Sequence, residues 1–139
     1  MRFELERALL GGELGVDELP GAWDEAYERR LGLRPRDAAE GVLQDIHWSM
    51  GAFGYFPTYT LGNLIAAQLF AAARRALGDL DAAFARGEFA PLLEWLRKHV
   101  HAHGGLHDAS DLVLRATGSP LAVGDYLCAR KADVREYYG

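Results

Sequence analysis

Apolar residues along the chain recur mostly at helical spacing, and no strand-length window alternates strictly between apolar and polar positions. Glycine and proline residues separate the apolar segments, as is typical of helix ends and turns. The pattern predicts an all-α fold, a compact bundle of about six to seven helices joined by short loops. Eight stretches, slightly more than this expected number, show a helical pattern, at residues of about 3–10, 20–32, 38–47, 58–77, 80–86, 91–103, 109–117 and 123–138.

The most apolar segment lies within the longest of these helices, between Leu64 and Ala73. It is far shorter than the roughly 20 apolar residues that span a bilayer, and it contains Gln68. We therefore expect a buried helix in the middle of the fold and no membrane contact. At later helix starts, Asp79 is a candidate cap, and Asp108 followed by Asp111 resembles a capping box.

A dense group of aromatic and polar residues surrounds a segment, Gly51–Pro57, whose glycines and proline exclude a regular helix. Polar groups among aromatic rings are typical of ligand pockets, where a few donors and acceptors orient a ligand. They can equally satisfy the unpaired N–H and C=O groups of irregular backbone. Both interpretations stay open for the candidate residues, which are Gln44, Asp45, His47, Trp48, Tyr55 and Tyr59.

Composition limits the remaining classes of function. The chain has 139 residues, of which 50% are hydrophobic, enough for one helical domain over residues 1–139. A net charge of −5 leaves no basic excess for phosphates, so a nucleic-acid partner is not expected. Cys128 is the single cysteine and cannot form an internal disulfide, which favours a reducing compartment. With no apolar leader after Met1, we expect a cytoplasmic protein.

Histidines near residue 100 are the first place to look for a metal site. If one helix extends to residue 103, His99 and His103 share a face at the i, i+4 spacing that zinc sites use. The zinc-peptidase motif His-Glu-x-x-His requires glutamate directly after the first histidine, and here that position is Val100. These histidines are therefore weak candidates, and packing against the core or capping a helix end explains them as well.

Several segments together resemble one known family, the Taq-type thermostable metallocarboxypeptidases, which are all-helical zinc peptidases. The resemblance is strongest on both sides of the glycine-broken segment. The segments that carry it are Arg2–Leu9, Leu19–Trp23, Gly41–Trp48, Gly51–Asn63 and Glu94–Arg97. The likeness covers nearly all of this chain but only the C-terminal quarter or so of the family's chains, and it weakens beyond about Gly124.

The resemblance implies an enzyme that releases C-terminal amino acids from peptides with one zinc ion. In the family, a His-Glu-x-x-His helix supplies two ligands and the base, and a glutamate supplies the third ligand. None of these motifs occurs in the 139 residues. By position, the resemblance places the six candidate residues named above near the catalytic cleft, where they would support the site or contact substrate.

These observations predict a carboxypeptidase-related protein without autonomous catalysis and with no cofactor of its own. We expect it to act through self-association, protein contacts or peptide binding, with a homodimer or a partner chain covering surface that is interior in the family. The alternative is a metallocarboxypeptidase in which this chain is a fragment, or one chain of a larger zinc enzyme. A new metal site at His99 and His103 is the remaining hypothesis.

Overall fold

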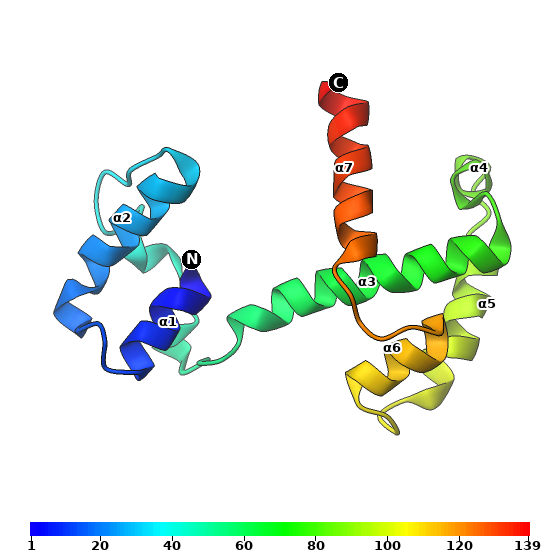
Figure 1. The fold of residues 1–139 in the computed structure, drawn as a ribbon, viewed down its shortest axis with the longest axis horizontal. Helices are drawn as coiled ribbons and strands as arrows, with labels where there is room; N and C mark the ends of the chain where they lie inside the picture. The colour runs from blue at the N-terminus through cyan, green and yellow to red at the C-terminus, as the bar shows by residue number, and fades with distance from the viewer. The chain divides into compact units, whose positions relative to one another are not determined.

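The computed structural model describes residues 1–139 and contains seven α-helices and no strand (Figure 1). The all-α prediction is therefore confirmed. The helices are α1 (Arg2–Leu10), α2 (Leu19–Leu31), α3 (Phe56–Leu77), α4 (Leu80–Ala85), α5 (Ala90–His99), α6 (Ala109–Thr117) and α7 (Gly124–Tyr138). Short 3₁₀ turns lie at Val16–Glu18, Val42–Gln44, Trp48–Met50 and His101–His103.

The chain divides into two compact units, Met1–Tyr59 and Thr60–Gly139. Whether residues 1–139 fold as the single domain expected from composition stays a prediction. Helix α3 starts in the first unit and contributes most of its length to the second.

In the first unit, helices α1 and α2 contact each other, and α2 also contacts the 3₁₀ turns that precede and follow it. Pro20 lies in the first turn of α2, where its missing N–H has no intrahelical partner to lose. The α2 side chains of Trp23 and Ala26 are buried, together with Phe56 at the start of α3 and Glu6 on α1. This small core holds the backbone around the glycine-broken segment.

In the second unit, the core lies where the C-terminal half of α3 meets α4, α5 and α6. Ala72, Ala73, Leu80 and Trp95 form its buried centre. Half-buried side chains pack around them, namely Leu69, Phe70, Phe84, Leu92, Leu96 and Ala116. Helix α7 contributes no fully buried residue.

Gln68 is a buried polar side chain in this unit, only 2% exposed. Its amide nitrogen lies 3.2 Å from the Thr117 hydroxyl, 3.1 Å from the carbonyl oxygen of Ser119 and 3.0 Å from that of Pro120. Its carbonyl oxygen accepts a hydrogen bond from the backbone N–H of Ala122 at 3.0 Å. One side chain of α3 therefore satisfies much of the irregular backbone between α6 and α7.

The helix expected over residues 38–47 is absent, and that expectation was wrong. This stretch forms turns and the 3₁₀ turn Val42–Gln44. The Asp37 carboxylate accepts a hydrogen bond from the Glu40 N–H, which offers the backbone an alternative to the helix. Gly41 is buried, and a Cβ there would lie 3.1 Å from Asp24 Oδ1 and 3.2 Å from the Asp37 carbonyl oxygen. The backbone at Gly41 therefore lies close against Asp24 and Asp37, and residues 38–47 do not form a helix.

One expected helix boundary and one expected cap also differ. Helix α5 ends at His99 rather than residue 103, because Val100 leaves the helical region at φ −126° and ψ −64°. At the start of α6, Asp108 makes no capping hydrogen bond through its side chain, so the expected capping box does not form. The predicted cap at Asp79 is confirmed, since its carboxylate accepts from the Ala82 N–H at 3.0 Å.

Helix α3 is less buried than its apolar sequence predicts. Leu61 is 45% exposed, and Leu64 and Ile65 are half-buried. Neighbouring helices pack mainly on the part of α3 around Ala72 and Ala73, so the turns before it keep exposed apolar side chains. None of the helices is long and apolar enough to cross a lipid bilayer.

Replacing Gln68 with alanine should destabilise the second unit. The substitution leaves the Ala122 N–H and the Pro120 carbonyl oxygen without a partner, whereas the Ser119 carbonyl oxygen keeps the Thr117 hydroxyl. We expect a loss of roughly 2–3 kcal/mol in unfolding free energy. Guanidinium unfolding followed by circular dichroism measures the loss. Asn63→Ala is the matched control, because Asn63 is an exposed amide on the same helix. Equal losses in the two variants would contradict the role of Gln68.

Candidate functional site

Asp45 and His47 lie side by side in the turn that precedes the glycine-broken segment. The Asp45 carboxylate oxygen Oδ1 accepts a hydrogen bond from the His47 backbone N–H at 2.9 Å, and the His47 ring atom Nδ1 is 2.5 Å from the same oxygen. The other oxygen, Oδ2, is 2.6 Å from Nε of Arg2 on α1. Asp45 therefore satisfies local backbone, as one interpretation of the sequence expects, and also orients an imidazole ring.

Aromatic rings enclose His47 on the other sides. Its ring centre lies 5.5 Å from that of Tyr55, 5.1 Å from that of Phe56 and 5.8 Å from that of Tyr59. The second ring nitrogen, Nε2, is 2.9 Å from the Tyr59 hydroxyl oxygen. Tyr55 and Tyr59 are 47% and 54% exposed, so two phenol rings beside the histidine face solvent.

Glu6 of α1 holds in place the loop that precedes Tyr55 and Phe56. Glu6 is 2% exposed, and its two carboxylate oxygens accept hydrogen bonds from the Trp48 indole N–H at 2.8 Å and from the Gly54 backbone N–H at 2.6 Å. Gly54 has φ +73°, a conformation that favours glycine. The Trp48 ring packs edge-on against Trp23 and Phe56. Glu6 thus fixes both ends of the turn before Tyr55.

Electrostatic contacts keep Asp45 ionised. Burial raises the pKa of the carboxyl, but hydrogen bonds from the backbone and ring of His47 and the charge of Arg2 outweigh it. The net result is a pKa below the ordinary value for aspartate.

The structure brings five of the six predicted residues together and places the sixth apart. Gln44 donates its side-chain N–H to the Ala39 carbonyl oxygen and contributes to a separate polar hollow beside Arg2 and Trp23. Sequence reasoning missed Arg2 and Glu6. Both lie more than 40 positions before their partners in the chain, and helical spacing gives no signal of such contacts.

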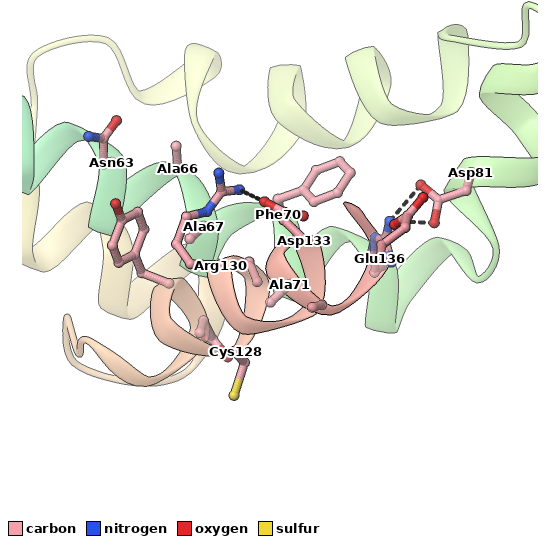
Figure 2. Close-up of a pocket in the computed structure, with 15 residues that line it drawn as sticks. Asn63, Ala66, Ala67, Phe70, Ala71, Asp81, Cys128, Arg130, Asp133 and Glu136 are labelled. Carbon is pink, nitrogen blue, oxygen red and sulfur yellow. Dashed lines mark hydrogen bonds and ion pairs between the residues drawn. The ribbon is translucent and has the colours of Figure 1, made fainter. Parts of the chain in front are cut away.

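A second hollow, of about 660 Å³, lies in the second unit between α3 and α7, and Figure 2 shows its lining. Alanines and Phe70 form much of the α3 side. The charged side chains include two ion pairs, Arg74 with Asp81 and Arg130 with Asp133. None of the six predicted residues lies here, so this groove is distinct from the aromatic cluster, which consists of His47 and the rings of Tyr55, Phe56 and Tyr59 around it.

Residues 1–132 match the family described as Carboxypeptidase Taq (M32) metallopeptidase. The chain belongs to the M32 carboxypeptidase family. A thermostable carboxypeptidase 1 from Thermus thermophilus is 48% identical over 139 residues, which are 100% of this chain and 27% of that protein. Carboxypeptidase 1 from Bacillus subtilis is 44% identical over 130 residues, covering 91% of this chain and 26% of that protein.

Solved structures agree with this membership. The M32 carboxypeptidase from Deinococcus radiodurans R1 has a TM-score of 0.95 and 46% identity, covering 99% of this chain and 28% of that one. Metallocarboxypeptidase 1 from Trypanosoma cruzi has a TM-score of 0.89 and 38% identity, again over 99% of this chain and 28% of that one. The chain spans about a quarter of the length of these M32 relatives, in agreement with the predicted likeness to a C-terminal portion of the family.

The residues present do not fit the zinc ion that the M32 resemblance implies. No three histidine, cysteine, aspartate or glutamate side chains gather in a way that could hold a metal ion. The expectation that His99 and His103 share one α-helix was wrong. His99 is the last residue of α5, and its ring packs against Trp95 with ring centres 4.7 Å apart. His103 lies in a separate 3₁₀ turn, and its ring neighbours His107.

Glu6→Gln should loosen the loop beneath the aromatic cluster. A glutamine side chain has only one acceptor oxygen, so either the Trp48 indole N–H or the Gly54 N–H loses its partner. We expect a loss of roughly 1–3 kcal/mol in unfolding free energy, measured by denaturant titration. The control is Glu25→Gln, which changes an exposed glutamate on α2. A loss no larger than the control's would show that Glu6 does not hold the loop.

Lowering the pH should weaken the contribution of Asp45. Because its pKa is lowered in the folded state, its stabilising effect is complete above the unfolded pKa of about 3.9 and is lost as the pH falls through the folded pKa. Asp45→Asn should therefore be less stable than the unaltered protein near neutral pH, and the gap should narrow below about pH 4. Unfolding free energies measured across this range test the prediction. With Asp17→Asn, an exposed control, the gap should stay small at every pH.

Proposed function

We propose that these 139 residues form a carboxypeptidase-related protein without autonomous catalysis, which acts through protein contacts and binds peptide at the aromatic cluster. Two observations together carry the proposal. Hydrogen bonds order Asp45, His47 and Tyr59, and the Tyr55 ring packs against His47, whereas no group of side chains fits a zinc ion. Family membership makes a peptide the natural ligand class.

Peptide binding is supported by the chemistry of the exposed side chains. Tyr55 and Tyr59 offer apolar ring area and hydroxyl groups, which suit an extended chain with alternating side chains and amide groups. His47 packs against both phenol rings and is held by Asp45, so the imidazole ring that they contact has a defined orientation. We propose that His47, Trp48 and Asp45 support this face and that Tyr55 and Tyr59 contact the peptide, with Gln44 outside it.

The proposed lack of autonomous catalysis follows from what a zinc peptidase requires. A Lewis acid and a positioned general base are both needed to activate water toward a peptide bond. The 139 residues contain no His-Glu-x-x-His sequence to supply them. We therefore derive no catalytic step from these side chains.

Self-association is supported by the apolar surface. Exposed large apolar side chains outnumber buried ones, and they include Leu43, Ile46, Met50 and Phe53 near the candidate site. Such side chains favour a protein contact over solvent when they are contiguous. We propose a homodimer, or a partner chain, that covers part of this surface. A cytoplasmic location and the absence of a nucleic-acid partner stay predictions.

A second candidate function is supported by the extent of the match. The relative from Thermus thermophilus matches every residue of this chain but is almost four times as long. In this alternative, the chain is part of a larger zinc metallocarboxypeptidase that releases C-terminal amino acids, and other polypeptide supplies the metal ligands and the base.

Activity measurements separate the two functions. The purified chain should not hydrolyse N-blocked dipeptides with or without added zinc. The same assay is run after co-expression with the part of the Thermus thermophilus relative that this chain does not match. Zinc-dependent release of the C-terminal residue only in the co-expressed sample would support the alternative, especially if His47→Ala lowers it more than Ser110→Ala, an exposed control.

Zinc-dependent activity of the chain alone would contradict the main proposal. Native mass spectrometry of the untagged protein tests its second part, because one spectrum reports both the number of chains and bound metal. We expect a dimer free of zinc. A monomer at micromolar concentration would contradict self-association, and one zinc per chain or per dimer would contradict the absence of a metal site.

A further inference from the structure

Four side chains form a continuous path from α1 to the exposed edge of the aromatic cluster. Arg2 contacts Asp45, Asp45 contacts His47, and His47 contacts Tyr59. From Asp45 outward the side chains become more exposed, from 6% for Asp45 to 22% for His47. Tyr59 at its end is 54% exposed. A buried charge is thus connected to a solvent-facing hydroxyl through a single imidazole.

The contacts of Asp45 decide where the His47 ring carries its proton. An ionised carboxylate only accepts hydrogen bonds, so an Nδ1 atom 2.5 Å from Oδ1 must carry hydrogen. The lowered pKa keeps Asp45 in this acceptor form at neutral pH. Arg2 occupies the other oxygen, which prevents the carboxylate from turning away.

The other ring nitrogen then has a fixed role. A neutral imidazole that carries hydrogen on Nδ1 has a lone pair on Nε2, and that lone pair can only accept. The Tyr59 hydroxyl, 2.9 Å away, must therefore donate its hydrogen to His47. Its oxygen keeps lone pairs that point away from the ring. The only ion pair of the imidazole is the one with Asp45, and Tyr55 and Phe56 pack against its ring.

We propose that Asp45 is a positioning residue that fixes His47 as the Nδ1–H tautomer, so that the exposed Tyr59 oxygen serves as a hydrogen-bond acceptor for a backbone N–H of a bound peptide. The ligand half of this inference rests on the proposed peptide binding. The tautomer half does not, because it concerns the protein without ligand. Free imidazole side chains favour hydrogen on Nε2, so hydrogen on Nδ1 of His47 would be a specific sign of the contact with Asp45.

The tautomer is measured by nitrogen-15 NMR of the full chain with labelled histidine, at a pH where the His47 signals have reached their neutral-form plateau. The unaltered protein should show hydrogen on Nδ1 of His47. Asp45→Ala removes the acceptor, and the ring should shift toward hydrogen on Nε2. Asp17→Ala is the matched control and should leave the tautomer unchanged. Tyr59→Phe should also keep hydrogen on Nδ1.

An Nε2–H tautomer in the unaltered protein would overturn the inference without any variant, so the test does not depend on whether Asp45→Ala folds. An unchanged tautomer in a folded Asp45→Ala protein would show that other contacts set it.

The ligand half is tested with acetyl-trialanine and with the depsipeptide analogues that replace one amide N–H by an ester oxygen. One analogue should bind about two- to tenfold more weakly than the amide peptide, the value of one hydrogen bond. Tyr59→Phe should remove this difference. Equal binding of all the peptides to the unaltered protein would overturn the Tyr59 contact. Binding of none would overturn it together with the proposed peptide site, while the tautomer result would stand separately.

Discussion

The buried carboxylate of Glu6 is the contact on which the candidate site depends. A charged group at 2% exposure is tolerated only when its hydrogen-bonding capacity is satisfied, and here both partners come from one loop, the Trp48 indole and the Gly54 amide. The two bonds determine where the Trp48 ring packs and where Tyr55 and Phe56 leave the loop to begin α3. The positions of His47 and Tyr59 then follow from these neighbours.

All members of the aromatic cluster and its supports lie in the first unit, between Met1 and Tyr59. The proposed peptide-binding face is thus complete within a segment of less than half the chain. The groove between α3 and α7 belongs to the second unit and has a different character, because alanines and paired surface charges line it. Family membership applies to both units, since the match covers residues 1–132.

Much of the fold could be predicted from the sequence because glycine and proline mark most helix ends. Helices α1, α2, α3 and α7 lie within two residues of their expected bounds. Prediction failed where local side-chain contacts override the helical pattern, as at Asp37 and Gly41. It also failed at Val100, whose backbone leaves the helix although the apolar pattern continues.

The candidate site could be predicted in part for a related reason. Its aromatic residues are close together in sequence, so their density was visible, and the Asp45 contact with His47 spans only two positions. Arg2 and Glu6 reach the site from α1 across more than 40 positions, and a single sequence contains no pattern that reports such a distance. The same holds for Gln68, whose partners lie about 50 positions later.

The three tryptophans are divided between the two units, with Trp23 and Trp48 in the first and Trp95 in the second. Each unit therefore carries its own intrinsic fluorophore. In a Trp95→Phe protein, tryptophan fluorescence would come only from Trp23 and Trp48. In a protein that lacks those two tryptophans, it would come only from Trp95 in the core beside α5. Opening of one unit while the other stays folded would then be visible as an emission change from one population of indoles alone.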